Sequence, residues 1–291
     1  MNRFARIAAI ALLSLPLSAF AAGQPLNIVA AENFYGDVAQ QLGGRYVHVT
    51  SIMSNPDQDP HLFEASVSTA KALSGARIVV YNGIDYDPWM NKLLSATPSA
   101  NRKIIVAGQL MHKKTGDNPH LWYLPATMPV VARAITAELE AADPAHRSEY
   151  QQNMKHFLAS LEPLEHQIKS LHGRYAGSQV TATEPVFGYM ADALGFKMRN
   201  AGFQLAVMNN TEPSASQIAA FENDLKTRKV KVLFYNSQAS DPSAKRVQQI
   251  AIASKVPVVG VTETEPAGKR YQGWMTSQLD ALARALAGNA P

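Results

Sequence analysis

The chain contains no cysteine among its 291 residues. Disulfide bonds and thiolate metal sites are therefore excluded, and the folded state depends on a hydrophobic core for its stability. Charged residues are sparse at 17%, yet no internal stretch approaches the ~18–20 uninterrupted apolar residues of a membrane span. The hydrophobic fraction of 46% is too high for a disordered chain. These features favour a globular protein of two domains or one large domain.

The formal net charge is only +4, from 27 basic and 23 acidic residues. Two of the basic residues, Arg3 and Arg6, lie in an N-terminal segment that has the character of a removable signal. The densest basic run, 226–231, falls at the end of a predicted helix, where cations interact favourably with the helix dipole. We therefore expect no nucleic-acid partner.

Residues 1–21 have the pattern of a secretory signal peptide. A positive start precedes an apolar stretch at 7–17, and small residues stand at Ala19 and Ala21, the two positions that a cleavage site requires. No cysteine follows that could carry a lipid, so the sequence predicts a soluble periplasmic protein that is not a lipoprotein. We expect it to be a monomer.

Strand-like and helix-like segments alternate along most of the chain, a pattern that is typical of parallel sheets covered by helices. The predicted strands are 26–31, 47–53, 78–81, 103–107, 180–183, 230–234 and 256–261. The main predicted helices are 34–42, 68–73, 89–94, 128–142, 187–194, 214–227, 243–254 and 271–286. Ser214 and Gln217 have the spacing of a capping box at the start of one of these helices.

Residues 144–172 interrupt this alternation because they carry no strand signal. Apolar residues at spacings of three and four predict a long amphipathic helix there, and Pro163 should bend it. At 1.5 Å per residue such a helix is ~42 Å long, enough to cross a domain. The predicted fold class is therefore α/β, with two parallel-sheet lobes at 22–143 and 173–291 joined by a single long interlobe helix.

Four side chains that can bind metal follow predicted strands, where ligands of open α/β sheets collect. They are His61, His120, Glu184 and Glu263, two from each predicted lobe. The histidines share a context, Pro60-His61-Leu62-Phe63 and Pro119-His120-Leu121-Trp122, in which the proline restricts the backbone and helps to orient the imidazole. Taken singly, a loop histidine is usually a surface or hydrogen-bonded residue, and a glutamate at a strand end is often a helix cap.

The chain resembles the periplasmic solute-binding proteins of zinc and manganese ABC transporters over essentially its whole mature length. The most specific segments are Asp-Pro-His-Leu-Phe-Glu at 59–64 and Asn-Pro-His-Leu-Trp at 118–122. The segment 184–195, the strand before Glu263 and the predicted interlobe helix also fit. The resemblance implies two lobes tied by a rigid helix, with the metal ion buried in the cleft between them.

This resemblance assigns the ligands position by position. His61 and His120 match the first two, and Glu184 stands at the third, which is histidine in the zinc branch and glutamate in many manganese or iron members. The fourth is an aspartate in the family, and here Glu263 stands in its place, with Glu265 as a nearby competitor.

Two imidazoles and two carboxylates neutralise a divalent cation and suit Zn²⁺, or Mn²⁺ if the carboxylates bind through both oxygens. The long His- and acid-rich loop of many zinc members is missing, because 108–118 is short and holds only His112. Asp59, Glu64 and Asn236 are candidates for hydrogen bonds to the ligands. Loop hydration or helix capping is the alternative role for each of the three.

The resemblance thus predicts a non-catalytic protein that captures zinc or manganese and delivers it to an ABC importer permease. One alternative is a secreted metallohydrolase that uses the same ligands, although no His-Glu-x-x-His motif, nucleophile elbow or P-loop is present. Another alternative is a receptor for a different small solute, with the histidine pair incidental.

Overall fold

The computed structural model describes residues 24–55, 66–238 and 241–288. The predicted signal peptide at 1–21 lies outside this part of the chain, as do Asp59, His61 and Glu64. No helix among the described residues is both long enough and apolar enough to cross a bilayer.

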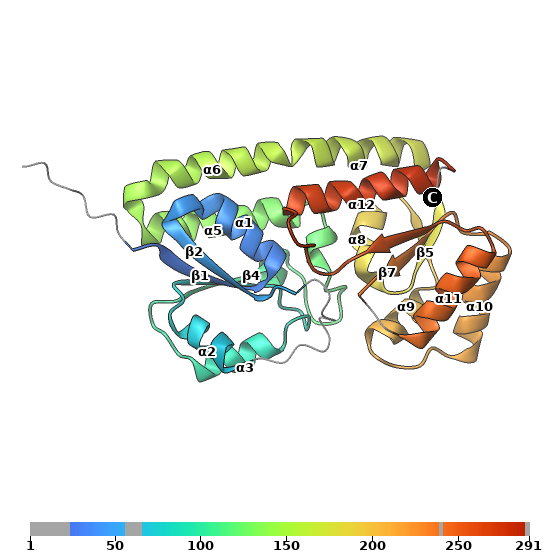
Figure 1. The fold of residues 1–291 in the computed structure, drawn as a ribbon, viewed down its shortest axis with the longest axis horizontal. Coiled ribbons are helices and arrows are strands. Elements are labelled where there is room, and N and C mark those ends of the chain that lie inside the picture. Colours follow the sequence, from blue (N-terminus) through green and yellow to red (C-terminus); the bar gives the residue numbers. More distant parts are fainter. Residues whose placement is uncertain (1–23, 56–65, 239–240, 289–291) are drawn as a thin grey trace, which may run out of the picture.

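Two sheets of four parallel strands each form the framework of the described chain (Figure 1). The first has the strand order β2-β1-β3-β4, and the second has the order β6-β5-β7-β8. Their bounds are β1 (Leu26–Glu32), β2 (Val47–Met53), β3 (Ile78–Tyr81), β4 (Lys103–Val106), β5 (Gln179–Ala182), β6 (Lys197–Arg199), β7 (Leu233–Asn236) and β8 (Val258–Val261). The prediction of an α/β fold with two parallel-sheet lobes is confirmed.

Helices cover both faces of each sheet, which is why central strands such as β3 are apolar throughout and buried at every residue. The helices of the N-terminal lobe are α1 (Asn33–Gly43), α2 (Val67–Ser74), α3 (Trp89–Ala96), α4 (Ala107–Leu110) and α5 (Thr127–Ala142). Those of the C-terminal lobe are α8 (Gly188–Ala193), α9 (Ala201–Met208), α10 (Ala215–Lys226), α11 (Pro242–Ala253) and α12 (Tyr271–Leu286). The predicted capping box is present at α10, where Ser214 Oγ accepts from Gln217 N at 3.3 Å and Gln217 Oε1 accepts from Ser214 N at 2.8 Å.

The predicted interlobe connector consists of α6 (Arg147–Ser160) and α7 (Glu162–Tyr175), which run in line past both sheets (Figure 1). The regular helix is interrupted at Leu161, two residues before Pro163. Proline has no backbone N–H to donate to the preceding turn, so it fits the first turn of α7 and not the middle of a continuous helix. The long connector is confirmed, and its break lies where the proline predicts a bend.

The two lobes share one hydrophobic core. A single cluster of buried side chains includes residues from both sheets and from α6, α7 and α12. Aromatic rings form a continuous path through it: Trp122 packs on Phe34 with centroids 4.6 Å apart, Phe34 lies 5.9 Å from Trp274, and Tyr123 lies 5.4 Å from Phe187 of the C-terminal lobe. This packing fixes the position of one sheet relative to the other.

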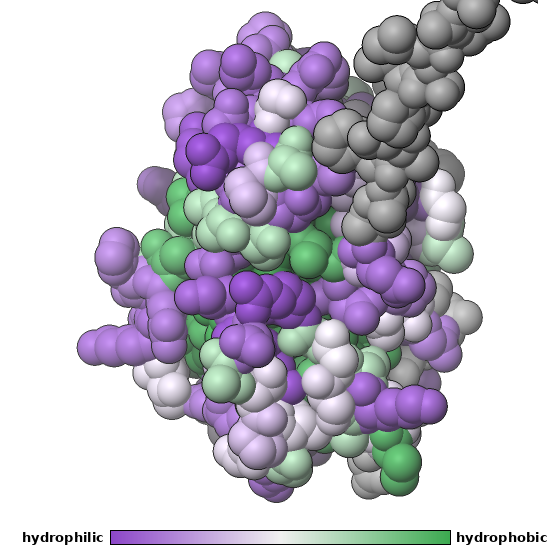
Figure 2. Space-filling view, turned by 90° about the vertical axis from the view of Figure 1, so that its left-hand side faces the viewer, coloured by the Kyte–Doolittle hydropathy of each residue, from purple (hydrophilic) through white to green (hydrophobic). Residues whose placement is uncertain are grey.

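In contrast to this hydrophobic core, the surface of the molecule is mostly polar. Hydrophilic side chains cover most of the end of the molecule that Figure 2 shows, and hydrophobic ones are visible mainly between them. Among the described residues, the exposed large hydrophobic side chains are Val67, Ile104, Leu205 and Ile252, each on a different element. The exposed apolar residues of the described chain are therefore scattered singly.

Candidate metal centre

The strand order brings the predicted ligands of the C-terminal lobe to one edge of its sheet. Glu184 follows β5 and Glu263 follows β8, and β7 lies between these two strands. Asn236 is the last residue of β7, so its side chain stands between the two glutamates. All three residues are buried, with exposed fractions of 3% or less.

His120 comes from the other lobe, in the loop after α4, and is completely buried. Its Nδ1 lies 2.7 Å from Asn118 Oδ1, and the same oxygen accepts from the backbone N of His120 at 3.1 Å. Because an amide oxygen can only accept, Nδ1 carries a proton, and Nε2 is the nitrogen that can bind a metal ion when the ring is neutral. Asn118 is itself held by the C-terminal lobe, since its Nδ2 donates to the carbonyl oxygen of Pro185 at 2.7 Å.

His120 Nε2 lies 3.4 Å from Glu263 Oε2, and both side chains are fully buried. Nε2 has no hydrogen-bond partner among the described residues. An imidazole lone pair and a carboxylate oxygen that face each other away from water repel unless a proton or a cation lies between them. Two ligands bound at about 2.1 Å to a tetrahedral Zn²⁺ are themselves about 3.4 Å apart, so the separation suits a shared metal ion.

Glu184 is linked to this pair through an amide. Asn236 Nδ2 donates to Glu184 Oε1 at 3.1 Å and to Glu263 Oε1 at 2.7 Å. The structure thus brings His120 and Glu263 into contact and joins Glu184 through Asn236. No group of three or more His, Asp, Glu or Cys side chains with metal-site spacing occurs in the described part of the chain, which does not contain His61.

Glu265, the predicted competitor of Glu263, makes different contacts. Its backbone N donates to Asn33 Oδ1 at 3.0 Å, and Asn33 Nδ2 donates to its carbonyl oxygen at 2.7 Å. Burial, and then the charge of Asp37, raise the pKa of the Glu265 carboxyl group to about 9. The contact with His120 that the structure describes is made by Glu263.

The N-terminal lobe contains a pair of buried acidic residues, Glu32 and Asp87, that the sequence analysis did not predict. Glu32 ends β1 and is fully buried, while the Asp87 carboxylate accepts from the backbone N of Asn82 at 2.7 Å and of Gly83 at 2.8 Å. Burial, and then the charge of Asp87, raise the pKa of Glu32 well above its ordinary value, and burial raises the pKa of Asp87 to about 6. Asp87 has the backbone donors, so Glu32 holds the shared proton. A glutamate that directly follows the apolar run Ile28–Ala31 at the carboxyl end of β1 is the signal that could have indicated it.

This acid pair predicts that the folded state loses stability as the pH rises. Unfolded carboxyl groups release their protons near pH 4, whereas the raised pKa values of the folded pair keep a proton on it to higher pH. We expect this pair to lower the free energy of unfolding of the metal-free protein by about 1–3 kcal/mol between pH 5 and pH 8. Glu32→Gln, which keeps a neutral side chain of the same size, should remove the contribution of the pair, whereas the contribution of Glu265, whose pKa is also raised, should remain. Urea titrations at both pH values measure it, with exposed Glu212→Gln as the control, and an unchanged loss would contradict the assignment.

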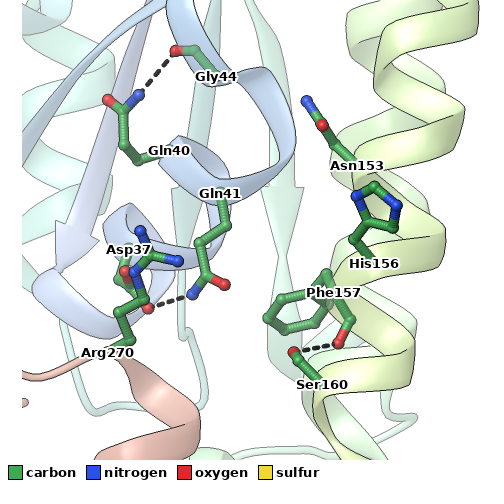
Figure 3. A pocket seen from close by; sticks show the side chains of 9 residues that line it. All are labelled: Asp37, Gln40, Gln41, Gly44, Asn153, His156, Phe157, Ser160 and Arg270. Carbon is green, nitrogen blue, oxygen red and sulfur yellow. Dashed lines mark hydrogen bonds between the residues drawn. The ribbon is translucent and has the colours of Figure 1, made fainter.

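A groove of about 600 Å³ lies elsewhere, between α1, α6 and Arg270 (Figure 3). Gln40 and Gln41 line it from α1, and Asn153 and His156 line it from α6. None of the predicted ligands lines it. At its edge, Asp37 accepts from Gln41 Nε2 at 2.6 Å and from the backbone N of Tyr271 at 3.0 Å. The groove therefore marks the attachment of α12 to the N-terminal lobe.

Comparison with known proteins identifies the family of the chain. The family model for ZnuA, the periplasmic zinc-uptake complex component A, matches residues 28–285. The chain belongs to the ZnuA family. Among curated relatives, the manganese ABC transporter substrate-binding lipoprotein PsaA of Streptococcus mitis is 25% identical, over 92% of this chain and 91% of its own. The manganese-binding lipoprotein MntA of Bacillus subtilis is also 25% identical, over 91% of each chain.

Solved structures show the same fold. The periplasmic zinc-binding protein TroA of Treponema pallidum superposes with a TM-score of 0.76 at 20% identity, over 92% of this chain and all of TroA. ZnuA-family members are substrate-binding proteins, which confirms the prediction of a non-catalytic protein. Neither the hydrolase nor the receptor for a different solute finds support in these comparisons.

One prediction is contradicted by the same relatives. We expected a periplasmic protein that is not a lipoprotein, but PsaA and MntA are both named as lipoproteins. The expectation depended on a single negative feature, the lack of cysteine. We do not retain it.

Proposed function

We propose that this protein is the substrate-binding component of a metal ABC importer. It binds one divalent transition-metal ion, Zn²⁺ or Mn²⁺, where its lobes meet, and delivers the ion to the membrane permease. Membership of the ZnuA family and the metals named for its relatives support this function.

The proposed ligands are His120, Glu184 and Glu263, with His61 as the fourth. The observation that carries the proposal is the buried contact between His120 Nε2 of one lobe and Glu263 Oε2 of the other, 3.4 Å apart. The lone pair of Nε2 is directed by Asn118, which binds Nδ1 on the opposite side of the ring. A cation between the two lobes would therefore replace a repulsion with two coordinate bonds.

The remaining features of the proposal concern organisation and partners. A signal peptide at 1–21 precedes an N-terminal lobe at 22–143, a connector at 144–172 and a C-terminal lobe at 173–291. The protein acts as a monomer and binds no nucleic acid. The scattered exposed apolar side chains and the small net charge support both statements.

Titration of the metal-free protein tests the proposal. We expect one saturable site for Zn²⁺ with a dissociation constant below micromolar, measured by competition with a chromophoric chelator. His120→Ala should weaken binding at least ~100-fold, because it removes a nitrogen ligand from the site. His48→Ala, which removes an exposed imidazole from β2, is the matched control. Equal affinities of the two variants would refute the proposed site.

The affinity should also depend on pH. Imidazole binds a metal ion only in its neutral form, and ordinary imidazoles take up a proton near pH 6.5. We therefore expect the affinity for Zn²⁺ to fall at least ~10-fold between pH 7.5 and pH 5.5. A constant affinity over this range, measured with a chelator of known proton affinity, would exclude histidine ligands.

A further inference from the structure

The two lobes carry an asparagine at the same place in their sheets. The strand orders β2-β1-β3-β4 and β6-β5-β7-β8 correspond strand by strand, so β3 and β7 are equivalent. Each pairs in parallel with the first strand of its lobe, and each leads into the dipeptide Tyr-Asn, at Tyr81-Asn82 and Tyr235-Asn236. The amide of Asn236 donates to two proposed carboxylate ligands. Asn82 occupies the equivalent position in the N-terminal lobe, where it binds a different group.

Asn82 binds the peptide unit that precedes His120. Its Nδ2 donates to the carbonyl oxygen of Pro119 at 2.9 Å, and this contact is buried. The nitrogen of the same peptide unit, the backbone N of His120, donates to Asn118 Oδ1 at 3.1 Å. Because a peptide unit is planar, hydrogen bonds to its oxygen and from its nitrogen together fix the plane. The plane in turn sets the direction in which the imidazole leaves the backbone.

The backbone at His120 lies outside any regular helix or strand. Its φ of −76° and ψ of 57° are those of an inverse γ-turn, in which the backbone N of Leu121 donates to the Pro119 carbonyl oxygen at 2.7 Å. A turn of three residues is closed by this single bond, so the neighbouring side chains must supply the rest of its support. The amides of Asn82 and Asn118 do so from opposite ends of the peptide unit.

The orientation of the Asn82 amide is fixed by its partners. A carbonyl oxygen can only accept, so the amide group that faces Pro119 must be Nδ2, whose remaining N–H donates to the Gly83 carbonyl oxygen at 3.1 Å. On the other side, Asn82 Oδ1 accepts from the hydroxyl of Tyr35 on α1 at 2.8 Å. Asn82 and Tyr35 are both completely buried. A rotated amide would place its oxygen against the Pro119 oxygen with no water to separate them.

We infer that Asn82 positions the metal ligand His120, by holding the peptide unit in front of it. The inference rests on the proposed function, and of the proposed ligands it requires only His120. Asn82 is a positioning residue, because it acts through His120 and not by contact with the ion. Without its hydrogen bond the turn has to be ordered when the ion arrives, and that loss of conformational entropy lowers the affinity.

Asn82→Leu tests the inference, since leucine has a similar volume and no N–H group. We expect the affinity for Zn²⁺ to fall by about 10–100-fold. The same substitution in the His120→Ala background should change the affinity by less than about threefold, because the ligand through which Asn82 acts is gone. Competition titration of the metal-free proteins with chelators of graded affinity measures all four dissociation constants.

Tyr35→Phe is a milder second variant that tests the same inference if Asn82→Leu does not fold. It removes only the hydroxyl that orients the Asn82 amide, so we expect a fall in affinity of about 3–10-fold. This fall should also vanish in the His120→Ala background. Thr136→Val is the matched control, because it removes a buried hydroxyl that donates within α5 of the same lobe and should leave the affinity unchanged.

The double-mutant comparison separates positioning from a general structural role. Losses of the same size with and without His120 would show that Asn82 acts on the fold as a whole, and they would overturn the inference. Unchanged affinity in both Asn82→Leu and Tyr35→Phe would overturn it as well, and either result leaves the proposed function intact. If the wild-type protein does not bind Zn²⁺, or if His120→Ala binds it as tightly as wild type, the proposed function itself fails.

Discussion

We expect Glu263→Ala to lower the affinity for Zn²⁺ at least ~100-fold and Glu265→Ala to change it by less than about threefold. The two residues are separated by one position, yet Glu263 faces His120 whereas the backbone of Glu265 pairs with Asn33. Removing Glu263 also leaves His120 Nε2 buried opposite an empty volume. Competition titration of both variants at pH 7.5 measures the difference.

Several controls make this comparison decisive. Both variants remove a buried glutamate from the same segment, so a general loss of stability affects them alike, and thermal melting of the metal-free proteins checks it. Glu263→Asp restores the aspartate that the family resemblance predicts at this position, and it should recover part of the affinity. The reverse order of effects would assign Glu265 as the fourth ligand.

Trp274→Ala destabilises the protein by about 3–5 kcal/mol, the largest effect on stability that we expect from one substitution. Trp274 is 1% exposed, its ring lies 5.9 Å from both Phe34 and Tyr123, and its Nε1 donates to Thr262 Oγ1 at 2.9 Å. The substitution therefore leaves a cavity in the core that the two lobes share and removes a bond beside Glu263. Urea unfolding of the metal-free protein, followed by circular dichroism, measures the loss.

The form of the unfolding curve is part of the same prediction. Because the lobes share a core, we expect one cooperative transition in both wild type and variant. Trp89→Ala, at a half-buried position on α3, is the matched control and should cost less than half as much. Two separate transitions in the wild-type protein would show that the lobes are stable independently, contrary to the shared packing.

Periodicity in the sequence predicted most of the fold. The longer strands and helices are apolar and periodic enough to be recognised, and the capping box placed the start of α10. The strand β6 and the helix α9 escaped prediction, because β6 is only three residues long and two of these are Lys197 and Arg199. Arg199 Nε lies 2.6 Å from Asp224 Oδ2. The two residues are far apart in the chain, so no local sequence pattern predicts this ion pair.

The sequence predicted only part of the site, because several of its contacts also have no signal in the local sequence. We predicted His120, Glu184 and Glu263 as ligands because each follows a predicted strand. The carboxyl ends of parallel strands lie on one edge of a sheet, so residues there come close together. The bonds of Asn236 to both glutamates depend on the strand order, which the sequence does not state. The proton shared by Glu32 and Asp87 depends on burial and on the loop at 82–87, and neither is visible in a composition or a motif.

The paired hydrogen bonds between Asn33 and Glu265 tie the loop that carries Glu263 to the N-terminal lobe, with no metal ion required. An incoming ion therefore meets donors that are already in place, and little conformational entropy is lost when it arrives. Loss of the ion does not by itself free the loop, because both hydrogen bonds must break before it can leave the N-terminal lobe.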